Sequence, residues 1–163
     1  INLAIRNIRE DKDEILYKVS KQVSEIDDKT KILIEDMKET MYKYDGIGLA
    51  AVQVGVLKQI IVYDFKYIEE DGVKNPQVLF NPRIIKHSKK MITTEEGCLS
   101  FPDFYGKVDR FESITVEAED ISMNTYTFKA KELGAVVLQH EIDHLNGKVF
   151  KSIAYDTYYG EKD

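Results

Sequence analysis

Residues 132–147 read ELGAVVLQHEIDHLNG, and this stretch decides the fold. Its apolar side chains recur at helical spacing and Gly147 follows them, which predicts a helix over residues 132–146. His140 and His144 lie four residues apart, which places them one helical turn apart on the same face. Their side chains, about 5–6 Å from each other, can therefore reach a common point. Predicted strands precede this helix along most of the chain. Strands that surround a late helix indicate an α+β fold.

The two histidines of this helix predict a metal site. Imidazoles one turn apart can chelate a single ion, and Glu141 between them is placed to meet a water bound to that ion as a general base. The alternative is a surface helix that carries two histidines by chance. Val136, Val137 and Leu145 indicate instead that the helix is buried, where unpaired imidazoles would be costly.

A third protein ligand is expected, because catalytic sites of the zinc type hold three. In metalloproteases with the longer H-E-x-x-H-x-x-G-x-x-H pattern it lies ten residues after the first histidine, where this chain has Phe150. We therefore expect the ligand upstream, and Cys98 in the stretch EEGCLS is the candidate. Two alternatives stay open: Cys98 as a small buried apolar residue, and a downstream carboxylate from Asp156, Glu161 or Asp163.

Residues 46–53, GIGLAAVQ, form a loop of small residues that ends in the amide of Gln53. The spacing is like that of a dinucleotide-binding loop, but such a loop follows a strand and opens a helix. Here a predicted helix precedes it and a strand follows, which disfavours nucleotide binding. The loop permits close approach of another group to its backbone, and the Gln53 amide can donate to an oxyanion.

Composition limits the other classes of function. The 163 residues, 43% of them hydrophobic, predict one domain over residues 1–163 with a single core. A net charge of −6 argues against a broad nucleic-acid face. There is no apolar run of membrane-spanning length and no signal-peptide layout, so we expect a cytoplasmic protein without a membrane partner.

Periodicity predicts the remaining elements. A first helix is expected over residues 11–23, and a second from Asp27 or Asp28 to the Asp45-Gly46 pair, with apolar residues four apart. Strands are expected at residues 60–65 and 78–80, with a hairpin tip at 69–72 between them, and at residues 91–95. Residues 113–118 and 125–130 alternate and read as paired strands joined by a turn over 120–124.

Three segments together resemble the peptide deformylase family, whose motifs are G-x-G-x-A-A-x-Q, E-G-C-L-S and Q-H-E-x-D-H in this order. Every motif position is present, at residues 46–53, 96–100 and 139–144. The resemblance implies antiparallel β-sheets wrapped around the helix that carries the histidines, with two N-terminal helices. It also implies a hydrolase that removes the formyl group from N-formylmethionine of nascent bacterial polypeptides and releases formate.

The resemblance also implies roles for residues of this chain. Cys98, His140 and His144 would hold the metal, Glu141 would move protons, and the Gln53 side chain and the Leu99 N–H would stabilise the oxyanion. The Gly97 carbonyl and the Ile47 N–H would bind the peptide backbone like an added strand. We also expect a substrate-binding surface, with ordinary core packing as the alternative for its apolar members, formed by Ile47, Gly48, Leu133, Val136 and Val137.

The implied cofactor is one divalent ion, Fe²⁺ in the native enzyme, with Zn²⁺, Ni²⁺ or Co²⁺ able to substitute. The implied partners are formylmethionyl peptides and, transiently, the ribosome. Some members dock on the ribosome with a basic C-terminal helix, whereas residues 152–163 here are rich in tyrosine and only weakly charged. Tyr105 stands where some members have an arginine near the substrate entrance, so their recognition of downstream residues does not carry over.

Two other functions are compatible with part of this pattern. A metalloprotease would share the histidine helix but would need a downstream ligand. A metal-stabilised binding module would keep the ligands but would not need both Glu141 and Gln53.

Overall fold

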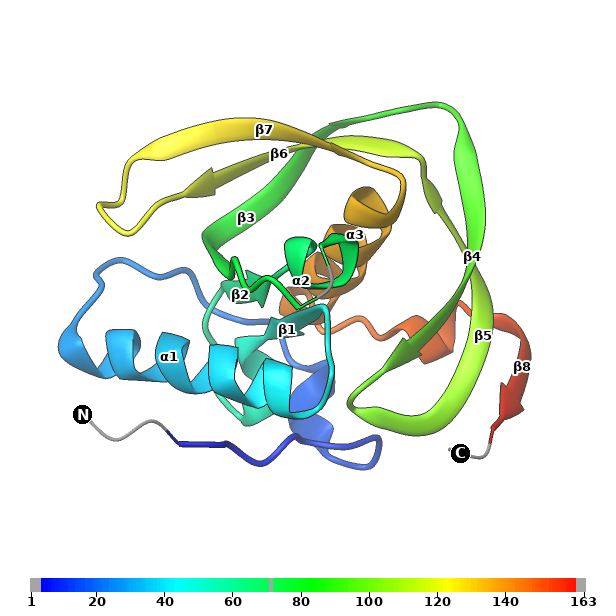
Figure 1. The fold of residues 1–163 in the computed structure, drawn as a ribbon, viewed down its shortest axis with the longest axis horizontal. Helices are drawn as coiled ribbons and strands as arrows, with labels where there is room; N and C mark the ends of the chain where they lie inside the picture. Colours follow the sequence, from blue (N-terminus) through cyan, green and yellow to red (C-terminus); the bar gives the residue numbers. More distant parts are fainter. Residues whose placement is uncertain (1–3, 71, 161–163) are drawn as a thin grey trace.

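The computed structural model describes residues 4–70 and 72–160, and its centre is the helix α3 (Leu133–Leu145). Figure 1 shows α3 with strands of one sheet above it and strands of a second sheet beside it. The first sheet has the order β1-β2-β3-β6-β7 and the second β4-β5-β8, and all their pairings are antiparallel. This architecture confirms the predicted α+β fold. The strands are β1 (Gly48–Ala50), β2 (Ile60–Tyr63), β3 (Gln77–His87), β4 (Met91–Cys98), β5 (Phe101–Phe111), β6 (Ser113–Glu119), β7 (Thr125–Lys131) and β8 (Tyr155–Tyr159).

Helix α1 (Asp28–Lys43) forms where the sequence predicts it. The Asp27 carboxylate accepts a hydrogen bond from the Thr30 N–H at 2.8 Å and thereby caps the helix. Leu33, Met37 and Met41 then point into the core, where they pack against strands β1 and β2. Packing this apolar stripe fixes the start of the loop over residues 46–53, which follows the helix directly.

Helix α3 is apolar on most sides, and nine of its residues are buried. It therefore sits inside the molecule rather than on its surface. Gly147 ends it with a φ of +72°, and a Cβ there would lie 2.6 Å from the Tyr17 carbonyl oxygen. This close approach requires glycine.

The paired strands β6 and β7 confirm the predicted alternation. Ile114, Val116 and Ala118 of β6 are buried, while the residues between them face outward. Val116 lies opposite Phe128 in the register of the two strands. The alternating pattern thus covers one side of α3 with an apolar sheet face.

The helix predicted over residues 11–23 is wrong. Only a single 3₁₀ turn, η1 (Glu14–Tyr17), forms, and Val19 is 65% exposed. The backbone beyond it bonds to other segments, because the Ser20 N–H donates to the Leu145 carbonyl and the Lys21 N–H to the Leu57 carbonyl. These long-range bonds hold the segment extended. The molecule therefore has one N-terminal α-helix instead of two.

The remaining elements differ from the prediction in extent. Strands β2 and β3 form the expected antiparallel pair, but the short helix α2 (Lys66–Glu69) occupies part of the expected hairpin tip. Strand β4 runs on to Cys98, and β5 and β8 were not predicted. The short 3₁₀ turns η2 (Ala51–Val54) and η3 (Phe150–Ser152) complete the fold. No helix within the described part of the chain is long and apolar enough to cross a membrane.

Candidate active site

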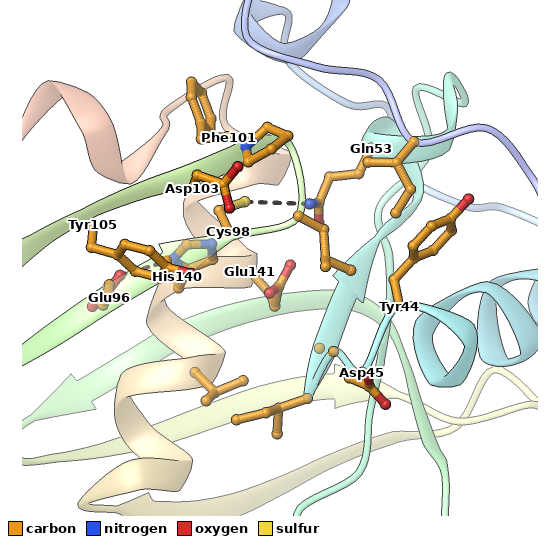
Figure 2. Close-up of a pocket in the computed structure, with 18 of the residues that line it drawn as sticks. Tyr44, Asp45, Gln53, Glu96, Cys98, Phe101, Asp103, Tyr105, His140 and Glu141 are labelled. Atoms are coloured by element: carbon orange, nitrogen blue, oxygen red, sulfur yellow. Dashed lines mark hydrogen bonds and ion pairs between the residues drawn. The ribbon is translucent and has the colours of Figure 1, made fainter. Parts of the chain in front are cut away.

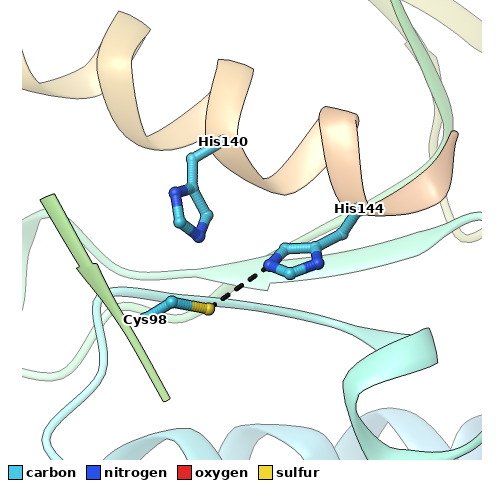
Figure 3. A group of neighbouring side chains, drawn as sticks. All are labelled: Cys98, His140 and His144. Carbon is cyan, nitrogen blue, oxygen red and sulfur yellow. Dashed lines mark hydrogen bonds between the residues drawn. The ribbon is translucent and has the colours of Figure 1, made fainter. Parts of the chain in front are cut away.

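The sulfur of Cys98 and the rings of His140 and His144 meet at one point (Figure 3). Cys98 ends strand β4, and the two histidines lie one turn apart on α3. One ligand atom from each residue lies within 4.8 Å of the others, and the Cys98 Sγ is 3.4 Å from the His144 Nε2. Strand β4 therefore brings Cys98, which precedes the histidines in the sequence, next to both of them.

These three residues fit a transition metal ion. A thiolate and two imidazoles are typical donors for zinc and iron, with bonds of about 2.0–2.3 Å. The His140 Nδ1 is held by Glu96 Oε1 at 2.8 Å, which leaves its Nε2 free to coordinate. The His144 Nδ1 is buried without a hydrogen-bond partner among the described residues. The donor set and its spacing thus suit one ion.

The pKa values of the two imidazoles are shifted in opposite directions. Burial lowers the pKa of His140, but the Cys98 sulfur and the Glu96 carboxylate raise it by more, so its net shift is upward. Burial lowers the pKa of His144, and positive charge at His140 and Arg110 lowers it further. A coordinated cation would favour the neutral form of both rings, because imidazoles bind metals unprotonated.

Glu141 lies beside the cluster with its carboxylate on the cavity. The residue is only 5% exposed, and its Oε1 has no hydrogen-bond partner within the described chain. Burial raises the pKa of Glu141 to about 7. Strand β1 approaches it closely, since a Cβ at Gly48 would lie 3.0 Å from Glu141 Oε2. A buried carboxyl that titrates near neutrality is suited to accept and return a proton.

Gln53, from the 3₁₀ turn after β1, faces the same point (Figure 2). Its Oε1 accepts a hydrogen bond from the Ala50 N–H at 2.9 Å, which fixes the orientation of the amide. Its Nε2 then points to Ser100 Oγ at 3.2 Å and to Cys98 Sγ at 3.5 Å. The loop of small residues thus positions an amide donor beside the metal ligands.

A cavity of about 940 Å³ extends from this cluster to the surface. Its lining residues include Gln53, Cys98, Leu99, His140 and Glu141. All residues predicted to bind substrate also line it, namely Ile47, Gly48, Gly97, Leu133, Val136 and Val137. Leu133 is 46% exposed, so it lies at the outer part of the cavity.

The comparisons with known proteins agree with this geometry. The family model described as polypeptide deformylase matches residues 5–156. The peptide deformylase of Acetivibrio thermocellus is 49% identical over 148 residues, covering 91% of this chain and 82% of the relative.

Solved structures give the same result. The peptide deformylase of Legionella pneumophila superposes with a TM-score of 0.86 at 40% identity, over 94% of this chain and 88% of that one. A class I type b peptide deformylase of Acinetobacter baumannii, solved with Met-Ala-Ser bound, gives a TM-score of 0.84 at 30% identity over 92% and 98% of the two chains.

The chain belongs to the peptide deformylase family.

The predicted activity is thereby confirmed. The chain is a hydrolase that removes the N-formyl group from nascent polypeptides, and metal dependence is a trait of its family. The Cys98, His140 and His144 cluster is the group of described residues suited to hold that metal.

This deformylase has a buried ion-pair network behind His140. Arg110, on β5, contacts Glu96 through Nη2 at 2.9 Å and Asp143 through Nη1 at 3.0 Å. Glu96 was part of a recognised motif, but its contact with His140 was not anticipated. The position of Glu96 two residues before Cys98, beside a predicted metal site, was the available signal.

Of the alternative third ligands in the tail, the structure describes only Asp156. Asp156 lies on the exposed strand β8, where its carboxylate pairs with Lys107 Nζ at 3.4 Å. Glu161 and Asp163 lie outside the described residues.

Proposed function

We propose that Cys98, His140 and His144 bind one divalent ion, Fe²⁺ in the native enzyme, with Zn²⁺, Ni²⁺ or Co²⁺ as substitutes. Both kinds of ligand, thiolate and imidazole, suit these ions, and affinity alone does not select iron among them. When bound, such an ion supplies the Lewis acidity that polarises a carbonyl and makes a water molecule nucleophilic near neutral pH. Glu96 keeps the His140 ring oriented for coordination through its bond to Nδ1.

Glu141 accepts a proton from the attacking water and returns it to the leaving amine. Glu141 lines the cavity, its Oε1 has no hydrogen-bond partner among the described residues, and its pKa of about 7 balances proton uptake against proton release. The Gln53 Nε2 and the Leu99 N–H donate to the formyl oxygen as negative charge develops there. The contact of Gln53 with Cys98 Sγ is long, at 3.5 Å, so that donor can turn to the substrate.

The methionine side chain packs against Ile47, Leu133, Val136 and Val137, all of which line the cavity. The Gly97 carbonyl and the Ile47 N–H bind the peptide backbone as an added strand. Gly48 leaves room for the formyl end next to Glu141. The Met-Ala-Ser peptide held by the Acinetobacter baumannii enzyme supports a methionine-first ligand at this site.

We further propose that residues 1–163 act as one catalytic domain in the cytoplasm, on formylmethionyl chains as they emerge during synthesis. Any contact with the ribosome is transient. The catalytic pocket provides the main contact with the nascent chain.

This proposal is supported best by two observations. One cavity is lined by Gln53, Cys98, His140 and Glu141. The cluster suited to a metal adds His144 to Cys98 and His140. The test is formate release from formyl-Met-Ala-Ser, with acetyl-Met-Ala-Ser as the matched substrate. We expect a far higher rate with the formyl peptide. The acetyl group carries a methyl group in place of the formyl hydrogen, and the space between Gln53, Leu99 and the ion should not accommodate it. Equal rates would refute the proposed oxyanion site.

The variant Glu141→Gln distinguishes a general base at this position from a metal ligand. It should retain the metal content of the wild type and lose about 10²–10⁴-fold in kcat, the usual contribution of a general base. A parallel loss of metal and activity would show that Glu141 is a ligand instead. Metal analysis and kcat are measured on the same preparation.

A further inference from the structure

Residues 4–10, here called the strap, run alongside helix α1 (Figure 1). Asp36 on α1 is only 3% exposed, so its carboxylate needs partners that compensate for lost hydration. Asp36 Oδ1 accepts from the Ala4 N–H at 2.9 Å, and its Oδ2 lies 3.0 Å from both Nε and Nη2 of Arg6. One turn later, the buried Thr40 Oγ1 accepts from the Arg6 N–H at 2.9 Å. Two buried polar residues of α1 therefore anchor the strap.

The other end of the strap contacts the turn that carries Gln53. The Arg9 N–H donates to the Gln53 carbonyl at 2.7 Å. This carbonyl lies near the end of the 3₁₀ turn η2, and the N–H groups that follow the turn bond to the carbonyls of Ala51 and Val52. The Gln53 carbonyl therefore depends on a partner from outside the turn. The strap supplies that partner.

The Arg9 side chain covers the end of the same turn. Gly55 caps η2 with a φ of +87°. It lies so close to the strap that a Cβ there would be 2.7 Å from Arg9 Nη2. Arg9 Nη1 lies 3.0 Å from Asp13 Oδ2, and this ion pair holds the guanidinium against the turn. Arg9 thus contacts η2 through both its backbone and its side chain.

The strap also forms part of the wall of the catalytic cavity. Asn7, Ile8 and Glu10 line this cavity together with Gln53. Ile8 also packs against the apolar core that α1, β1 and β2 share. The strap is therefore held between the core and the cavity, next to the turn that presents the amide donor.

Gln53 is fixed at two points. Its Oε1 accepts from the Ala50 N–H at 2.9 Å, within its own segment, and its carbonyl accepts from Arg9 of the strap at 2.7 Å. The first bond sets the orientation of the amide. The second sets the position of the backbone from which the side chain extends.

We propose that the strap positions the oxyanion site, and that Arg9 is a positioning residue whose backbone N–H holds the Gln53 amide where negative charge develops. The inference rests on the proposed function, in which Gln53 donates to the formyl oxygen. Donors that are fixed in advance are effective because they need no rearrangement when the charge forms. A loosened strap would leave the amide present but imprecisely placed.

The test is a double-mutant cycle on kcat for formate release from formyl-Met-Ala-Ser by the metal-loaded enzyme. Arg9→Pro removes the N–H donor and should lower kcat by about tenfold or more, as small misplacements of catalytic groups do. Gln53→Ala should cost about 10²–10³-fold. In the Gln53→Ala background, Arg9→Pro should change kcat by less than about twofold, because the amide that it positions is absent. A strap that only stabilised the fold would lower kcat by the same factor in both backgrounds.

Three further variants separate the parts of the strap. Arg9→Ala removes the guanidinium but keeps the backbone N–H, so it should lose less activity than Arg9→Pro. Asp36→Asn acts at the other end, where the amide offers the strap only one acceptor oxygen, and kcat should fall in the same non-additive way. The matched control is Glu35→Gln, the neighbouring carboxylate of α1, which pairs with Lys38 and not with the strap. It should keep the wild-type kcat.

Wild-type kcat in Arg9→Pro, or an equal effect of this variant in both backgrounds, would overturn the inference. An equal loss in Arg9→Ala would assign the effect to the guanidinium and overturn the role of the N–H. If Arg9→Pro does not fold, Asp36→Asn decides the matter by the same comparison. Wild-type kcat in Gln53→Ala would instead refute the oxyanion role in the proposed function, and the inference with it.

Discussion

Glu96 fixes the orientation of His140, one of the three proposed metal ligands. Its Oε1 accepts from His140 Nδ1 at 2.8 Å and from Arg110 Nη2 at 2.9 Å, and its Oε2 accepts from Arg110 Nε at 2.5 Å. Burial raises the pKa of Glu96, but the hydrogen bonds from His140 and Arg110 outweigh burial and hold it below its ordinary value. A buried carboxylate thus stays ionised behind a metal-binding imidazole.

The variant Glu96→Gln should weaken metal binding by about 10–100-fold, the usual effect of removing such a supporting carboxylate. The amide cannot accept from His140 and Arg110 with both of its polar atoms, so the ring loses its fixed orientation. Competition with a chelator measures the affinity. The matched variant Asp143→Asn removes the other carboxylate of Arg110, which does not touch His140, and should change the affinity less. Unchanged affinity in Glu96→Gln would contradict this role.

At the scale of elements, strand β1 and helix α3 together position Glu141, the proposed general base. Gly48 of β1 lies so close to α3 that a Cβ would be 3.0 Å from Glu141 Cγ and 3.1 Å from Val137 Cγ1. The variant Gly48→Val should therefore displace the Glu141 carboxylate and lower kcat by about 10²-fold, as small misplacements of catalytic groups do. Steady-state formate release measures kcat.

The control is Gly134→Ala on α3, where the added Cβ meets the Phe65 ring at 3.3 Å and not the base. It should retain most of the activity. Wild-type kcat in Gly48→Val would show that the close approach of the two elements does not position Glu141.

A buried carboxylate also joins helix α1 to the segment after β2. Asp64 Oδ2 accepts from Tyr42 Oη at 2.5 Å and from the Asn75 N–H at 2.7 Å. Burial raises the pKa of Asp64, but these hydrogen bonds and one from the Tyr67 N–H outweigh it, so the net shift is downward. A carboxyl with a depressed pKa contributes stability that is present above its unfolded-state pKa of about 3.9 and is lost as the pH falls through its folded-state pKa.

Tyr42→Phe removes one of these donors and should destabilise the fold by about 1.5 kcal/mol at pH 7, as for a hydrogen bond to a charged group. The free-energy difference from wild type should narrow below about pH 4, where Asp64 becomes protonated. Urea unfolding at several pH values measures it. Tyr67→Phe, in a ring that packs against Tyr42, is the control and should show no such pH dependence. If the difference in the free energy of unfolding between Tyr42→Phe and the wild type persisted at low pH, the effect would be due to packing instead.

At the scale of the whole molecule, a bound ion would join the two sheets through α3. Cys98 belongs to the β4-β5-β8 sheet, while α3 packs mainly on β1 and β7 of the other sheet. Metal binding energy then contributes to the stability of the entire fold.

Chelation of the ion should therefore lower Tm. An ion present at about 1,000 times its Kd contributes about 4 kcal/mol, which corresponds to roughly 8–16 °C for a domain of this size. Cys98→Ser should lower Tm without chelator and respond little to chelation. Asp156→Asn, which alters an alternative ligand in the tail, should behave like the wild type. Thermal unfolding with and without chelator measures each case, and a full chelator response in Cys98→Ser would remove Cys98 from the ligand set.

The sequence by itself determined the elements whose signals are local. The Asp27 cap and the apolar residues four apart specify α1, strict alternation specifies β6 and β7, and the spacing of His140 and His144 specifies the metal-binding face of α3. Each signal depends on neighbours within about one or two turns of helix or one strand. The motif residues of the site could therefore be predicted as well, because their order and spacing lie in the chain itself.

Only the tertiary structure decided the rest. The segment before α1 has a helical pattern yet stays extended, because Ser20 bonds to Leu145 at the far end of the chain. Strand β8 forms only through its pairing with β5, so no local periodicity reveals it. The same pairing brings Tyr158 to Glu95, which lines the cavity. Contacts between residues far apart in sequence leave no local pattern, since the partner that stabilises each conformation becomes a neighbour only after folding.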